Sequence, residues 1–286
     1  MKTLLLLLLA IMPLAGFPQS PSQPRLKGII HVEDLKLAIV QTSPSQSAEL
    51  MFCEGQREGG KAGGFELFAI DSTNRSVTAK FSTNAQPGIL TLTNAAANTI
   101  QRAPGIMLDE VSLQTVLDLF SVFSDRTLLQ HPLLPNVRFS LATTATNRSE
   151  AAQVLKSALS GKQIAVVPDG SKFLLVASEE RVTNLNPHSA TFTTTNLGVE
   201  KTELLPPGSI NFTSAPLWSV LMIYSDFSGG KLDVTGPSLP DGKVFLKMQT
   251  ALTREECLYA FETLVGWHGV KLVPTGTGGF KAVRTD

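Results

Sequence analysis

Two stretches, IMLDEVSLQTVLDLF at residues 106–120 and INFTSAPLWSVLMIY at residues 210–224, carry the same pattern of apolar side chains. Each opens with alternating apolar residues, the period of a strand, and continues with apolar residues three and four apart, the period of a helix. The similarity continues through a Leu-Pro turn, a further strand, a second helix and a Val-Pro strand end. Self-similarity at this length predicts one small domain used twice, an architecture that serves binding or assembly more often than catalysis.

We name residues 105–178 the first repeat and residues 209–286 the second repeat. Within each, the pattern predicts the order strand, helix, strand, strand, helix, strand. Thr253, followed three residues later by a glutamate, predicts a capping box at the start of the last helix, and Asn147 occupies the matching place in the first repeat. Two helices packed on one face of a small mixed sheet would satisfy this pattern.

The chain begins with a segment that is typical of export signals. Residues 1–16 combine Lys2, an apolar run and small residues before a cleavage point after Gly16. The apolar run is shorter than the about 20 residues that span a bilayer comfortably. Phe17 stands where a lipoprotein would carry its lipidated cysteine. We therefore expect an exported, periplasmic, non-lipidated protein, with an uncleaved anchor as the alternative.

The remaining segments complete the expected domain plan. Residues 17–25, rich in Pro, Ser and Gln, predict a flexible lead-in. Residues 26–93 show short strand-like runs separated by turns, with no helical stripe, and predict a small all-β domain. Residues 94–104 predict a linker and residues 179–208 a connector. The expected fold class is thus α+β, with a small all-β N-terminal domain followed by two tandem mixed-sheet domains, each with two helices on one face.

Composition narrows the classes of partner. The 286 residues and their 43% hydrophobic content are enough for two or three domains with respectable cores. The 24 basic and 24 acidic residues cancel, so the charge does not favour nucleic acid or an anionic membrane, and we expect contact with a membrane to be peripheral at most. The cysteines, Cys53 and Cys257, would form either one long-range disulfide or two buried thiols, of which the second is favoured.

A search for catalytic motifs finds no nucleophile elbow, zinc-protease helix, paired C-x-x-C or Walker loop. Ser228 and Lys231 match the S-x-x-K spacing, but the two glycines between them favour the end of a helix. The four histidines lack a second ligand at metal-binding spacing. We therefore expect no enzyme activity and no catalytic, cofactor-binding or metal site.

The second repeat resembles the small periplasmic N-domains of secretins, the outer-membrane channels of type II secretion and type IV pilus systems. Those domains run from an apolar strand through a helix with Val-Leu, a Val-x-Leu strand and a second helix to a Val-Pro end. The matching residues here are Ile210–Asn211–Phe212, Ala215–Pro216–Leu217, Val220–Leu221, Val244–Phe245–Leu246, Arg254 to Leu264 and Val273–Pro274. The first repeat matches this pattern more loosely.

Residues 26–93 resemble the β-rich homology region of the inner-membrane components that clamp onto secretins. That region orders an apolar strand, an E-G-x turn, a Gly-rich loop and a strand ending in I-D. The matching residues are Leu37 to Val40, Glu54–Gly55–Gln56, Phe65–Glu66–Leu67, Ala69–Ile70–Asp71 and Ser76–Val77–Thr78. We expect this chain to differ from both families, without an anchor of the inner-membrane type and without the channel region of secretins. The resemblance therefore implies a detached periplasmic partner of such a system.

The differences between the repeats indicate candidate partner-binding residues. Gln114 and Asp118 of the first repeat correspond to Trp218 and Met222 of the second, beside the apolar stripe of the helix. On the closing helix, a glutamine of the first repeat corresponds to Tyr259. Trp, Met and Tyr are favoured at the centres of interfaces. The alternative is that these side chains pack against the connector or the β-domain.

Together these patterns predict a non-enzymatic binding or scaffold protein of the periplasm, associated with a type II secretion or type IV pilus apparatus. Its partners would be secretins or other apparatus proteins, bound through helix faces or by adding an edge strand to a sheet. The alternative is an exported, self-associating structural module that is unrelated to secretion.

Overall fold

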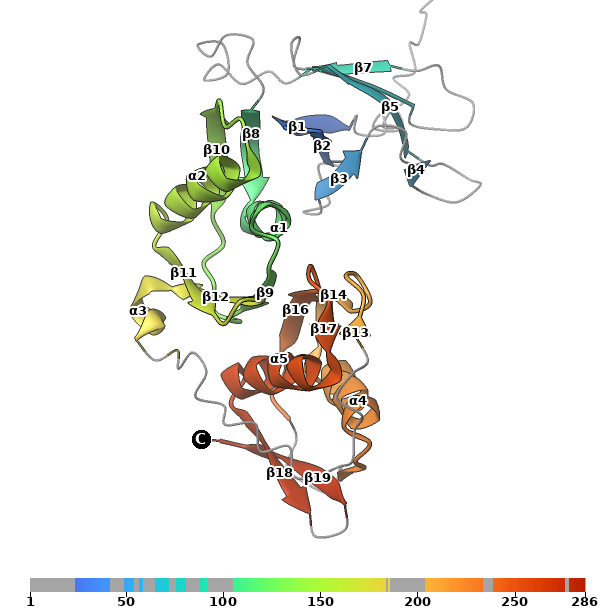
Figure 1. Ribbon diagram of the computed structural model, residues 1–286, viewed down its shortest axis with the longest axis vertical. Coiled ribbons are helices and arrows are strands. Elements are labelled where there is room, and N and C mark those ends of the chain that lie inside the picture. The colour runs from blue at the N-terminus through green and yellow to red at the C-terminus, as the bar shows by residue number, and fades with distance from the viewer. Residues whose placement is uncertain are drawn as a thin grey trace, which may run out of the picture.

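The computed structural model has a mixed α/β architecture (Figure 1). It describes residues 24–41, 49–53, 57–58, 65–71, 76–80, 88–91, 105–183, 185, 204–233, 239–275 and 278–285. The expected signal peptide, lead-in and linker, and most of the expected connector, lie outside these residues. Among the helices that the described ranges contain, none is long and apolar enough to cross a membrane.

The helices are α1 (Leu113–Ser124), α2 (Arg148–Ser160), α3 (Glu179–Val182), α4 (Leu217–Ser228) and α5 (Arg254–Trp267). The strands up to the first repeat are β1 (Arg25–Val32), β2 (Leu35–Gln41), β3 (Glu49–Cys53), β4 (Arg57–Glu58), β5 (Phe65–Asp71), β6 (Ser76–Lys80) and β7 (Gly88–Thr91). Those of the first repeat are β8 (Gly105–Ser112), β9 (Thr127–Gln130), β10 (Arg138–Thr143), β11 (Ile164–Asp169) and β12 (Phe173–Ser178). After it come β13 (Leu204–Leu205), β14 (Asn211–Pro216), β15 (Leu232–Asp233), β16 (Lys243–Lys247), β17 (Leu252–Thr253), β18 (Val270–Thr275) and β19 (Gly279–Arg284).

The two repeats share one order of principal elements. The first runs β8, α1, β9, β10, α2, β11, β12, and the second runs β14, α4, β15, β16, α5, β18, β19, with the short β17 just before α5. In both, the first and third of these strands pair antiparallel, the second pairs parallel with the last, and the last two form a hairpin. Each repeat therefore adds one strand to the predicted order.

A shared irregularity reinforces this correspondence. Glu110 in β8 and Ser214 in β14 both have positive φ, at 51° and 84°. At each of them the register with the partner strand shifts by a β-bulge. Because positive φ is unusual for residues other than glycine, the same bulge at the same place indicates that the two strands are equivalent.

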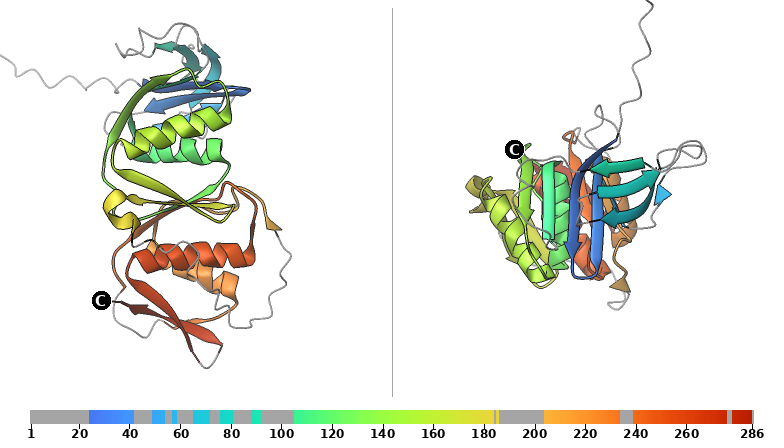
Figure 2. Two further views of the ribbon diagram at one scale, coloured as in Figure 1. Left: turned by 60° about the vertical axis from the view of Figure 1, so that its left-hand side comes forward. Right: turned by 90° about the horizontal axis from the view of Figure 1, so that it is seen from above.

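The helices do not lie on one face of one sheet, as expected, but between two sheets (Figure 2). In the first repeat, the sheet with β8 and β10 lies on one side of α1 and α2, and the sheet β11-β12-β9 lies on the other. The reason is the wide apolar surface of the helices. The buried residues of α1, for example, include Leu117 and Leu119, which are two positions apart and therefore point about 200° apart around the helix axis. A helix of this kind needs a layer on more than one side.

The predicted β-domain divides its strands between two sheets. Strands β1 to β3 extend the sheet of the first repeat, in the order β10-β8-β1-β2-β3, while β4 to β7 form a sheet of their own. Strand β1 is buried on both faces, since Ile30 joins the core under α1 and Ile29 joins the core shared with β5 and β6. A strand with two apolar faces needs a layer on each side. The domain boundaries stay predictions, but the pairing of β1 with β8 joins the expected β-domain to the first repeat across the linker predicted at residues 94–104.

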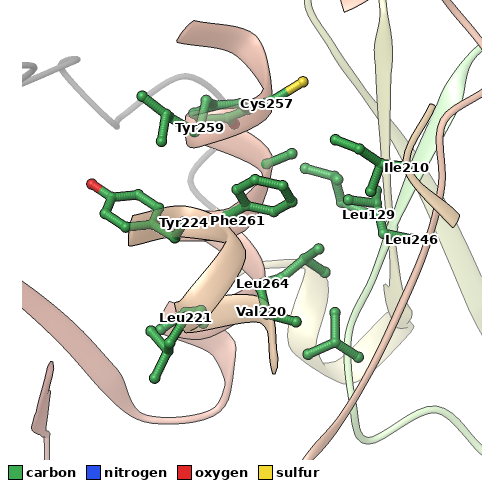
Figure 3. Close-up of a cluster of buried hydrophobic side chains, with 14 of the residues drawn as sticks. Leu129, Ile210, Val220, Leu221, Tyr224, Leu246, Cys257, Tyr259, Phe261 and Leu264 are labelled. Carbon is green, nitrogen blue, oxygen red and sulfur yellow. The ribbon is translucent and has the colours of Figure 1, made fainter. Parts of the chain in front are cut away.

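Successive residues of β9 belong to different cores. Leu128 packs in the core around α1 and α2, and Leu129 packs in the core of the second repeat. Strand β12 alternates in the same way, with Leu174 on the first side and Phe173 and Leu175 on the other. Figure 3 shows Leu129 in one cluster with residues of the second repeat. The sheet β11-β12-β9 therefore lies between helices α1 and α2 of its own repeat and the core of the second repeat.

Predicted helix caps are confirmed. The Asn147 side chain caps α2, and Thr253 forms a capping box with Glu256 at α5. Helix α4 ends at Ser228, and the next residue, Gly229, adopts the left-handed conformation, so Ser228 and Lys231 do not share a helical face. Cys257 is a buried free thiol, as favoured from the sequence, while the side chain of Cys53 lies outside the described part.

Candidate functional site

The outward face of α4 exposes two large apolar side chains. Helix α4 turns Val220, Leu221 and Tyr224 into the core. Trp218 and Met222 point the other way and are 45% and 44% exposed. Residues four apart lie one above the other on a helix, so the two side chains form one continuous surface. Two of the three predicted partner-binding residues thus lie together in an accessible place.

The corresponding face of α1 is covered. Gln114 donates a hydrogen bond from Nε2 to Oδ1 of Asp118 at 3.0 Å, and neither residue is fully exposed. Burial raises the pKa of the Asp118 carboxyl, although the positive charge of Lys247 on β16 and the bond from Gln114 oppose the shift. At the next residue after Gln114, the Thr115 hydroxyl donates to Oε2 of Glu49 on β3 at 2.7 Å. Polar residues suit this face of α1 because each of them forms a hydrogen bond with another side chain, so that its polar atoms are satisfied although they are partly buried.

Tyr259 does not join Trp218 and Met222. It is 5% exposed, and its ring lies 5.6 Å from the ring of Phe173 in the first repeat. Its hydroxyl donates to the carboxylate of Asp169, which is also buried. The change from glutamine to tyrosine is therefore explained by packing between the repeats. The prediction that Tyr259 shares a surface with Trp218 and Met222 is corrected on this ground.

Polar contacts also join the two repeats. Nζ of Lys172 lies 2.6 Å from Oε2 of Glu256. The Thr127 hydroxyl on β9 accepts a hydrogen bond from the backbone N–H of Gln249 at 3.1 Å. Gln249 lies just after the end of β16, and β16 itself contacts β9. In the two-stranded ribbon of β14 and β16, it is therefore β16 that faces the first repeat.

Sequence patterns missed a second part of the site, the edge of β14. Within the described ranges, β14 pairs with β16 alone, whereas its counterpart β8 lies between β10 and β1. The carbonyl of Ile210 accepts a hydrogen bond from the N–H of Met248 at 3.0 Å. Because backbone groups alternate along a strand, those of Asn211 and Thr213 point to the opposite edge. Only the comparison of two folded repeats could reveal this edge.

Titratable groups elsewhere have structural roles. The Tyr224 hydroxyl donates to Oε1 of Glu262 at 2.7 Å, and burial raises the pKa of both groups. Burial lowers the pKa of His131 and His268, and His131 packs against Trp267 with 5.5 Å between ring centroids. Within the described residues no cluster of three His, Cys, Asp or Glu side chains could hold a metal ion.

No family model, curated protein or solved structure matches the chain. The candidate site consequently rests on the geometry of α4 and β14.

Proposed function

We propose that this chain is a non-enzymatic binding or scaffold protein of the periplasm, associated with a type II secretion or type IV pilus apparatus. It would act through protein–protein contacts of two tandem α+β domains, preceded by a small β-domain. Secretins or other proteins of the apparatus are the proposed partners. This proposal joins the resemblance of the repeats to secretin N-domains with an accessible apolar surface on the second repeat.

One observation carries the proposal, the exposure of Trp218 and Met222 at positions where the first repeat has a paired glutamine and aspartate. Exposing such side chains has no benefit for folding, because their apolar surface stays in water. Trp is among the residues that dominate binding energy, and truncating such an anchor costs about 2 kcal/mol or more. A surface of this kind suits a protein partner.

The test is a pull-down from the periplasm of the native host, with the wild type and with the double variant Trp218→Asp, Met222→Lys as baits. A matched control, Leu133→Asp with Val273→Lys, places the same charges on exposed apolar residues elsewhere. Circular dichroism verifies that all three baits are folded. We expect secretin or pilus-assembly subunits with the wild type and the control, and their loss with the double variant.

Two results would redirect the proposal. Recovery that the double variant leaves unchanged would retain the partner and move the binding surface away from α4. Recovery of the chain alone by the folded wild type would replace the secretion assignment with self-association, which sedimentation at several concentrations would then quantify.

A further inference from the structure

The interface between the two repeats shows how one α+β domain docks on another in this fold. Strand β16 of the second repeat contacts β9, the edge strand of the sheet β11-β12-β9 (Figure 1). Just past β16, the backbone N–H of Gln249 donates to the Thr127 hydroxyl on β9. The positive charge of Lys247 on β16 acts on the carboxyl of Asp118 on α1. The β14–β16 ribbon therefore lies along the β9 edge, near the flank of α1 that carries Gln114 and Asp118.

Helix α5 covers the face of the same sheet. The ring of Tyr259 packs on the ring of Phe173 in β12, and Glu256 pairs with Lys172 just before that strand. Leu129 of β9 points the same way and is buried in the core of the second repeat. The first repeat thus receives the second through a strand edge, a sheet face and a helix flank.

The second repeat has the same strand edge and helix flank, and both are open within the described ranges. Strand β15 lies at the edge of the sheet β15-β19-β18, as β9 does in its own sheet, and both pair parallel with their neighbour. Trp218 and Met222 of α4 occupy the positions of Gln114 and Asp118 and are exposed. Since that flank of α1 lies near the ribbon of the following repeat, the exposed flank of α4 marks the place for the ribbon of a further α+β domain.

The sheet face of the second repeat differs in chemistry from its counterpart. Phe280 of β19 points into the core, so the next residue, Lys281, points outward. Opposite Lys281 lies Val273 of β18, which is 39% exposed, and Lys271 is exposed two residues earlier on the same face. The first repeat has the buried Leu175 in the position of Lys281. The open face is therefore basic around a small apolar centre.

We infer that the flank of α4, the edge of β15 and the outer face of the sheet β15-β19-β18 together bind an α+β domain of a partner protein, docked as the second repeat docks on the first. This inference rests on the proposed function and specifies the surface that the partner covers. The partner's ribbon turns apolar side chains toward Trp218 and Met222, and its helix turns carboxylates toward Lys271 and Lys281.

A second copy of the chain does not offer this chemistry. Its second repeat already docks through β16 and α5 on its own first repeat. Its first repeat would bring β10 and α2, the counterparts of β16 and α5. The exposed residues of β10 are Arg138 and Ser140, and every exposed residue of α2 is polar. Such a surface has no apolar side chain that could cover Trp218 and Met222, so the partner is a different protein.

The test measures the affinity of the full chain for the recombinant periplasmic N-domains of the host's secretin, by calorimetry. We expect Trp218→Ala to weaken binding about 30-fold, as truncation of an interface anchor does. We expect the double variant Lys271→Glu, Lys281→Glu to weaken it about tenfold at low ionic strength, and less at high ionic strength because salt screens exposed charges. A carbodiimide should cross-link Lys271 or Lys281 to carboxylates of the probe.

The matched control is Lys156→Glu with Lys162→Glu, which makes the same change of charge at exposed positions in and just after α2. We expect it to keep the wild-type affinity. Circular dichroism verifies that every variant is folded.

The outcomes separate the two proposals. Absence of binding to the folded wild type refutes the proposed function and the inference with it. Binding that depends on only one of the two surfaces, or on neither, refutes the inference alone, because a docked domain must cover the helix flank and the sheet face together. Self-association of the chain alone that Trp218→Ala abolishes, measured by sedimentation, identifies a second copy as the occupant and overturns the partner from another protein.

Discussion

Shortening Leu129 to alanine tests whether the two repeats share one core. Leu129 lies on β9 of the first repeat and is 0% exposed, but its side chain packs with residues of the second repeat. Replacing a buried leucine by alanine costs about 2–5 kcal/mol, because burial is lost and a cavity remains. The cavity here would lie between the repeats, in the cluster of Ile210 and Leu246 (Figure 3).

The assay exploits the position of the tryptophans. Both tryptophans of the chain, Trp218 and Trp267, belong to the second repeat, so fluorescence reports the unfolding of that repeat. A loss of about 3 kcal/mol corresponds to a fall in Tm of about 6–12 °C for a unit of this size. Leu129→Ala should therefore lower the Tm seen by fluorescence, although the substitution is in the first repeat. Far-ultraviolet circular dichroism should report the same fall.

Leu133→Ala is the matched control, since this leucine is 59% exposed and follows four residues later. Its effect should stay within about 0.5 kcal/mol. A fluorescence transition that Leu129→Ala leaves at the wild-type temperature, while circular dichroism shows a loss, would refute the shared core.

Three further predictions concern single side chains. Burial raises the pKa of Glu262 above 4.5 in the folded chain, so its contribution to stability is present at low pH and is lost as the pH rises through the raised pKa. The free energy of unfolding of Glu262→Gln, measured by urea titration and compared with that of the wild type, should therefore rise between about pH 4 and 7. A difference that does not change with pH would contradict this. Gly266→Ala should stabilise α5 by up to about 1 kcal/mol, since a Cβ at this position meets nothing within 4 Å. Gly105→Ala should instead strongly lower the Tm, because its Cβ would lie 1.9 Å from a carbonyl oxygen of β10. Burial raises the pKa of the Cys257 thiol to about 12, so in a Cys53→Ser background a thiol reagent at pH 8 should label the chain in denaturant and spare it when folded; rapid labelling of the folded chain would show that the thiol is accessible.

The candidate site was predictable in part. Trp218 and Met222 could be found because they are large apolar residues at outward positions of the helix, where polar residues are expected. The outward positions themselves follow from the period of the helix. Tyr259 interrupts the corresponding pattern on α5 in the same way, but what covers that face is a sheet of the first repeat. Periodicity determines the direction of a side chain from its own helix and says nothing of what lies there.

Local patterns in the sequence determined the types and order of the main elements, and the caps at Asn147 and Thr253. These features depend on neighbours within about four residues, so they can be found without knowing the fold. Only the tertiary structure decided that the helices lie between two sheets, that β1 pairs with β8 and that Leu129 packs in the second repeat. Strand partners and layer contacts join residues far apart in the chain, and many pairings satisfy the same alternation of apolar side chains. The choice among them depends on which pairing buries every apolar face of the chain at once.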